Sequence, residues 1–124
     1  MDNKFYVPFN TAKRLKEAGY NEPSTMVYNN LGELWSIGSV PRRNESNDIR
    51  QRVDINHITA PTYHEAVDWL EKKGYYVCTL HFEQGWSAIV NMVYVNKQRY
   101  ASRENALRLA IKYVLDKLEK GGAQ

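Results

Sequence analysis

In the stretch APTYHEAVDWLEKKGYYVCTLHFEQGWSAIVNMVYVNKQRY, residues 60–100, the hydrophobic period changes from that of a helix to that of a strand, and the predicted fold is built around this change. Thr62 precedes Glu65 by three residues, which is the capping-box pattern at the start of a helix. An apolar stripe at helical spacing then runs to Leu70, and Gly74 suits a helix terminus. The pattern predicts a helix over residues 62–73.

Residues 76–94 have the period of two that is typical of strands, and they form two runs on either side of Glu83-Gln84-Gly85. A three-residue loop with Gly85 in the left-handed conformation would pair Phe82 with Trp86. This register predicts a hairpin with one apolar face directed at the core. The side chains predicted on that face are Tyr76, Cys78, Leu80, Phe82, Trp86, Ala88, Val90, Met92 and Tyr94.

The other face of the predicted hairpin is more apolar than a solvated face needs to be. It contains Val77, Ile89, Val93 and Val95. We therefore predict that these four residues bind a protein partner or mediate self-association, with a homodimer as one assembly that this face would support.

The rest of the chain adds a helix ending at Ala18, strands over 25–28 and 34–37, and a last helix over 103–119 that Ser102 caps. Residues 38–54 are polar and predict a mobile loop, and Val53, Ile55 and Ile58 alternate as in an edge strand. We expect residues 120–124 to be a frayed tail.

These elements predict a single domain over residues 1–124 with the order α-β-β-α-β-β-α. The fold class is α+β, with two layers: a mainly antiparallel sheet of about four strands, and helices 62–73 and 103–119 on one face. The predicted core outside the hairpin is formed by Leu15, Val27, Trp35, Val67, Leu70, Leu107, Ile111, Val114 and Leu118.

The composition is that of an ordinary globular protein, with 43% hydrophobic residues and a net charge of +3. No run of about 18 apolar residues predicts a membrane span, and no signal-peptide pattern begins the chain. The single Cys78 excludes an internal disulfide and is typical of a reducing compartment. We therefore expect a cytoplasmic protein that does not bind a membrane.

No residue pattern points to catalysis. Cys78 and His81 are three residues apart on a strand, so their side chains point to opposite faces and cannot share a zinc ion. His64 and Asp68 share one helix face, as an acid–base pair or an ordinary solvated first turn would. We predict no catalytic residue, no metal and no cofactor, and hence a protein that is not an enzyme.

Basic residues offer an alternative function. Clustered guanidinium groups bind the phosphates of nucleic acids. The arginines that would do so here are Arg42, Arg43, Arg50, Arg52 and Arg99.

The segment YVNKQRYASRENALRLAI, residues 94–111, resembles the last strand and helix of a double-stranded-RNA-binding domain, or of antitoxins of the HicB type. In the RNA-binding family, two lysines near the start of this helix contact phosphates. Arg103 stands at one of these positions, and Glu104 takes the place of the other. Binding of duplex RNA is the function that this family implies, and the acidic Glu104 departs from the pattern and opposes it.

A second resemblance extends over the whole chain. The segments TAKRLKEAG (11–19), APTYHEAVDWL (60–70) and ASRENAL (101–107) together resemble short uncharacterised accessory proteins carried by phages and prophages of gut bacteria. This resemblance implies a location in the cytoplasm of an infected or lysogenic bacterial host. The leading hypothesis is a small non-enzymatic accessory protein that binds a host or phage macromolecule, more readily a protein than a nucleic acid.

Overall fold

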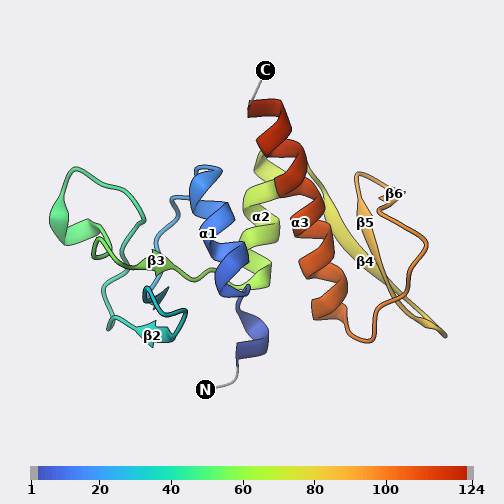
Figure 1. The fold of residues 1–124 in the computed structure, drawn as a ribbon, viewed down its shortest axis with the longest axis horizontal. Helices are drawn as coiled ribbons and strands as arrows, with labels where there is room; N and C mark the ends of the chain where they lie inside the picture. The colour runs from blue at the N-terminus through green and yellow to red at the C-terminus, as the bar shows by residue number, and fades with distance from the viewer. Residues whose placement is uncertain (1–2, 123–124) are drawn as a thin grey trace. The chain divides into compact units, whose positions relative to one another are not determined.

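In the computed structural model, which describes residues 3–122, the chain has an α+β fold with three α-helices and two three-stranded antiparallel sheets (Figure 1). Its contacts cluster into two compact units, unit 1 (Met1–Thr62) and unit 2 (Tyr63–Gln124). The prediction of one sheet of about four strands is wrong, because each unit contains a separate three-stranded sheet. The single domain over residues 1–124 stays a prediction.

Unit 1 packs one helix against a small sheet with the strand order β2-β1-β3. Its elements are η1 (Asn3–Phe5), α1 (Phe9–Glu17), β1 (Met26–Tyr28), β2 (Leu34–Ser36), η2 (Ile49–Gln51) and β3 (Ile58–Thr59). Val27 pairs with Trp35 on one side and with Thr59 on the other. The Tyr28 hydroxyl donates a hydrogen bond of 2.6 Å to the Val7 carbonyl, which ties the sheet to the start of the chain.

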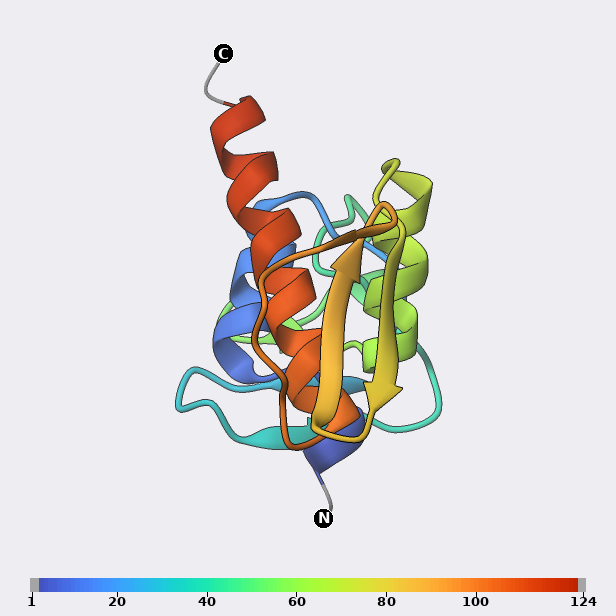
Figure 2. The same ribbon diagram turned by 90° about the vertical axis from the view of Figure 1, so that its right-hand side faces the viewer.

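Unit 2 is a three-stranded sheet with two helices on one face (Figure 2). Its elements are α2 (Tyr63–Lys72), β4 (Val77–Phe82), β5 (Gly85–Val90), β6 (Val93–Tyr94) and α3 (Arg103–Gly122). The core side chains that the helices bury are Ala66, Trp69, Leu70, Ala106, Leu107, Ala110, Ile111, Val114 and Leu115. Ser102 caps α3 as predicted, since its hydroxyl accepts a hydrogen bond of 3.1 Å from the Asn105 N–H.

The predicted element order lacks two short strands, although β3 begins at Ile58, the last residue of the predicted edge strand. The three predicted helices and both predicted hairpins are present, but β3 joins the first sheet and β6 joins the second. The last helix continues to Gly122 instead of ending at 119, and residues 123–124 of the predicted tail lie outside the described residues.

The predicted register of the second hairpin is wrong by one residue. The loop has two residues, so Phe82 pairs with Gly85, Thr79 with Ala88, and Val77 with Val90. Val77 and Val90 are buried on the face that the helices cover. Five residues predicted on the core-directed face of the hairpin are exposed instead: Tyr76, Cys78, Leu80, Met92 and Tyr94. Trp35 of unit 1, also predicted in the core, is 54% exposed.

The register is fixed by a close approach of the chain to Gly85. Trp86 and Tyr100 exchange two backbone hydrogen bonds of 2.8 Å, which draws Tyr100 across the start of β5. A Cβ atom on Gly85 would lie 2.6 Å from the Tyr100 carbonyl oxygen. Gly85 also has φ +131°, a conformation that L-residues avoid.

We predict that Gly85→Ala destabilises the protein far more than Gly74→Ala does. Gly74 has φ +95° but no atom within 4 Å of an added Cβ, so it reports the backbone strain alone. Urea denaturation should show a loss of about 1 kcal/mol for Gly74→Ala and of about 3 kcal/mol or more for Gly85→Ala. Equal losses would mean that the contact with Tyr100 does not constrain the hairpin.

Candidate functional site

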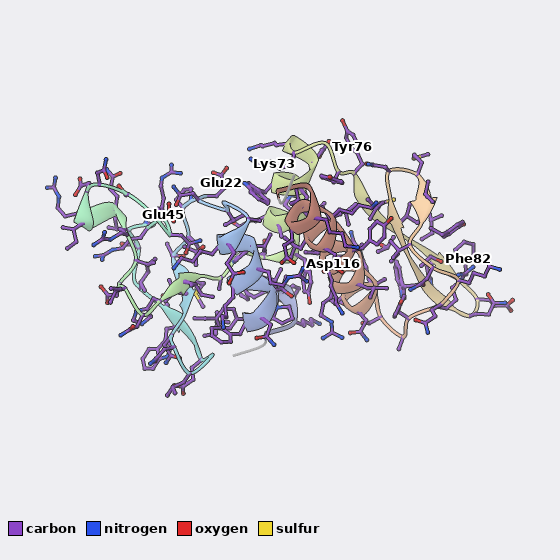
Figure 3. The ribbon with its side chains drawn as sticks, turned by 45° about the horizontal axis from the view of Figure 1, so that its top comes forward. Glu22, Glu45, Lys73, Tyr76, Phe82 and Asp116 are labelled. Carbon is purple, nitrogen blue, oxygen red and sulfur yellow. The ribbon has the colours of Figure 1, made fainter. Side chains whose placement is uncertain are left out.

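The sheet of unit 2 has a face that neither α2 nor α3 covers. Side chains alternate along β4, and Val77 points toward the helices, so Tyr76, Cys78, Leu80 and Phe82 point away from them. Figure 3 shows Tyr76 and Phe82 toward the two ends of β4. We call this surface the open face, and its residues are Tyr76, Cys78, Leu80, Phe82, Ser87, Ile89, Tyr94 and Arg99.

The open face is apolar and exposed over most of its length. Tyr76 is 59% exposed, Leu80 47% and Tyr94 49%. Ile89 and Ser87 of the central strand are buried between their neighbours. Since β4 contains no charged residue, this strand contributes aromatic and aliphatic contacts to the surface.

Arg99 supplies a cationic group at one end of the open face. Its guanidinium carbon lies 4.7 Å from the centre of the Phe82 ring and 5.8 Å from the centre of the Tyr94 ring. Both distances are within the range of cation–π attraction. Arg99 therefore links β4 to β6 across the face while its side chain stays exposed.

The turn beside the open face is strained. Asn91 (φ 51°) and Met92 (φ 69°) connect β5 to β6, and both lie in the left-handed region. Asn91 suits this turn and its Oδ1 accepts a hydrogen bond of 2.8 Å from the Tyr76 N–H. Met92 has no such compensation and its side chain is 91% exposed, next to Val93 at 66%. Strain of this kind is typical of functional surfaces.

The four residues predicted to bind a protein partner do not form one surface. Val77 is buried under the helices, and Ile89 is buried on the opposite face of the sheet. Val95 is half-buried and its N–H donates to the Ala88 carbonyl at 2.9 Å. Only Val93 is exposed, and because it pairs with Val90 its side chain points to the same side of the sheet as Val90, away from the open face. Ile89 and Arg99 of the open face were among the predicted binding residues. Its β4 residues were missed because the predicted register directed Tyr76, Cys78, Leu80 and Phe82 at the core.

Three of the five arginines predicted to bind phosphate form hydrogen bonds or an ion pair with other residues of unit 1. Arg43 is half-buried and donates to the Asn21 carbonyl at 2.8 Å, and Arg42 reaches the Arg52 carbonyl at 3.5 Å. Arg50 is paired with Asp48 at 3.2 Å, which lowers the pKa of that carboxyl group. The backbone bridge of Arg43 with Arg52 brings these residues together, whereas Arg99 belongs to unit 2.

The polar segment 38–54 is held by hydrogen bonds that its composition does not predict. Asn44 is buried; its side chain donates to the Tyr20 carbonyl at 2.9 Å and accepts from the Thr59 N–H at 2.8 Å. Asn21 and Glu45 exchange a further pair of hydrogen bonds. No sequence signal distinguishes Asn44 from the other asparagines of the segment, and the mobility of the loop stays a prediction.

The remaining candidate residues, His64 with Asp68 and Cys78 with His81, lie outside the open face or do not converge on one site. His64 Nε2 and Asp68 Oδ2 are 3.4 Å apart on the exposed side of α2, and Cys78 and His81 point to opposite faces of β4. Within residues 3–122, no group of three or more His, Cys, Asp or Glu side chains is placed to hold a metal ion. None of the helices in that range is long and apolar enough to span a bilayer.

Comparison with protein-family models, with curated proteins and with solved structures finds no match for this chain.

We predict that Met92→Gly stabilises the protein, because glycine adopts the left-handed turn without strain. The free energy of unfolding in urea should rise by about 0.5–1 kcal/mol. The matched control is Met92→Ala, which removes the exposed side chain and retains the strain, and should change stability by less. A loss of stability in Met92→Gly would show that the side chain packs against the protein.

Proposed function

We propose that this protein is a small non-enzymatic accessory protein that binds another protein through the open face of unit 2. The observation that carries the proposal is the row of exposed apolar side chains on a sheet face without helix cover. Isolated exposed hydrophobic residues are normal in proteins, but a contiguous apolar patch is typical of an interaction surface. The resemblance to phage and prophage accessory proteins supports a host or phage macromolecule as the partner.

The composition of the open face favours a protein partner. Tyrosine, phenylalanine, methionine and arginine are enriched in protein interfaces, and all four types occur on the open face or its adjoining turn. The strained turn supports the same proposal, since Met92 projects a flexible apolar side chain that adapts to a binding surface.

A second candidate function is favoured by Arg99. Aromatic rings and a guanidinium group on an open sheet form a surface on which the bases of single-stranded nucleic acid stack. Phe82, Tyr94 and Arg99 provide such a group. This candidate differs from the first in its dependence on salt, because phosphate binding weakens steeply as salt rises.

The proposed function predicts that Tyr94→Asp weakens partner binding. A charge on the open face would have to be desolvated against an apolar partner surface. The measurement is affinity capture from a lysate of a lysogenic gut bacterium, with identification of the specifically bound protein and titration of that purified protein by calorimetry. The dissociation constant should increase at least about tenfold for Tyr94→Asp.

The matched control is Trp35→Asp, which places the same charge on an exposed aromatic position of β2 in unit 1. It should leave the dissociation constant unchanged. Equal weakening by both substitutions, or by neither, would contradict a partner site on the open face.

The nucleic-acid candidate predicts binding to single-stranded DNA or RNA that Arg99→Gln weakens and that falls with rising salt. Gel-shift titrations at low and at moderate salt, with duplex DNA and duplex RNA beside the single strands, measure both effects. Arg50→Gln is the control, because Arg50 is exposed and already paired with Asp48. Absence of binding at low salt, where phosphate attraction is strongest, would exclude this candidate.

A further inference from the structure

Strand β4 lies at the edge of its sheet, with β5 on one side only. The Asn91 N–H donates to the Tyr76 carbonyl at 2.9 Å, so the residue just before β4 directs its backbone groups at β5. Hydrogen-bonded positions alternate in an antiparallel pair. The N–H and C=O groups of Val77, Thr79 and His81 therefore point outward from the sheet.

These outward groups have no backbone hydrogen bond to another of the residues 3–122. Figure 2 shows β4 at one side of the sheet, with the helices behind it. Unpaired groups along a strand are a template for pairing with another strand. β4 exposes three consecutive outward residues, which is enough for a complete antiparallel pairing over residues 77–81.

The edge lacks the features by which proteins prevent such pairing. Natural edge strands are protected by lysine, proline, a bulge or a short length. β4 has six residues, VCTLHF, without proline, lysine or any charged residue, and its register with β5 is uninterrupted. β2 of unit 1 has only three residues and is followed by Gly38 and Pro41.

We propose that β4 pairs with β4 of a second copy of this chain, antiparallel about a twofold axis at Thr79. Thr79 then faces Thr79 of the other copy, and Val77 faces His81. All three outward residues of each copy form hydrogen-bonded pairs, and the two sheets become one sheet of six strands. A slip to any other antiparallel register leaves at least one outward residue of each copy unpaired.

Charges at the two ends of β4 favour the antiparallel arrangement. Lys72 and Lys73 precede the strand, and Glu83 follows it. Figure 3 shows Lys73 at the Tyr76 end of β4, away from Phe82. Antiparallel pairing brings Glu83 of each copy to the lysine end of the other, whereas parallel pairing would bring like charges together. A second copy is thus complementary to the edge in hydrogen bonding and in charge.

The dimer goes beyond the proposed function and does not depend on it. It joins the open faces of two copies into one continuous surface, with Leu80 of one copy beside Cys78 of the other. Tyr94 lies on β6, two strands from the pairing edge, so substitutions there separate partner binding from dimer formation.

The first test is the mass of the purified full-length chain, measured by sedimentation equilibrium over a range of concentrations. We expect the mass of two chains, with a monomer at high dilution. Thr79→Pro removes the outward N–H at the twofold axis and leaves the hydrogen bonds to β5 intact. It should weaken the dimer at least about tenfold, because two intermolecular hydrogen bonds are lost.

The control Tyr94→Asp should dimerise like the unaltered chain. Far-UV circular dichroism of Thr79→Pro establishes that it folds. A monomeric unaltered chain at high concentration would overturn the proposal, as would a folded Thr79→Pro that dimerises with unchanged affinity.

The second test does not require Thr79→Pro to fold. In the proposed register, residue 80 of one copy faces Cys78 of the other in a non-hydrogen-bonded pair, where Cβ atoms are about 4.5–5.5 Å apart. Leu80→Cys should therefore form a covalent dimer under mild oxidation with diamide. Tyr94→Cys is the matched control, an exposed thiol on the same face that has no partner across the axis. Equal crosslinking of both variants would overturn the register.

Discussion

The close approach of Tyr100 to Gly85 is the constraint on which the structure of unit 2 depends. The two hydrogen bonds between Trp86 and Tyr100 leave no space for a Cβ atom at position 85. Gly85 consequently opens β5 directly after a two-residue loop, and every pair along the hairpin follows from that position. Because the side-chain period of a strand is two, this loop determines that Val77 and Val90 face the helices while Leu80 faces outward.

The sequence predicts what is determined locally. The α2 and α3 helices follow from capping residues and apolar stripes that lie within one or two turns of each other. The register of the second hairpin does not, since it depends on a contact of Gly85 with a residue fifteen positions later. The hydrophobic pattern predicted the wrong register. The reason is that the outward set Tyr76, Cys78, Leu80 and Phe82 is more apolar than the inward set Val77, Thr79 and His81.

The candidate site was predictable only in part for the same reason. Composition identifies the arginines, but not that Arg43 and Arg50 bond to backbone and carboxylate groups of their own unit. Likewise, nothing in the sequence distinguishes Asn44 from the polar residues around it, although its side chain bonds to the backbone of both Tyr20 and Thr59. An open face is visible in a sequence only after the register is known, and the register is the long-range property that the sequence leaves undetermined.

Three features of unit 2 oppose the stability or solubility of an isolated monomer. They are the apolar open face, the methionine in a left-handed turn and the uncharged edge of β4. The exposed side chains of the open face and of Met92 could be replaced without disturbing the core, because none of them packs under a helix. The edge and the face also meet at Cys78 and Leu80, so a strand added at the edge extends the face. The association proposed for this face and this edge would account for all three features together.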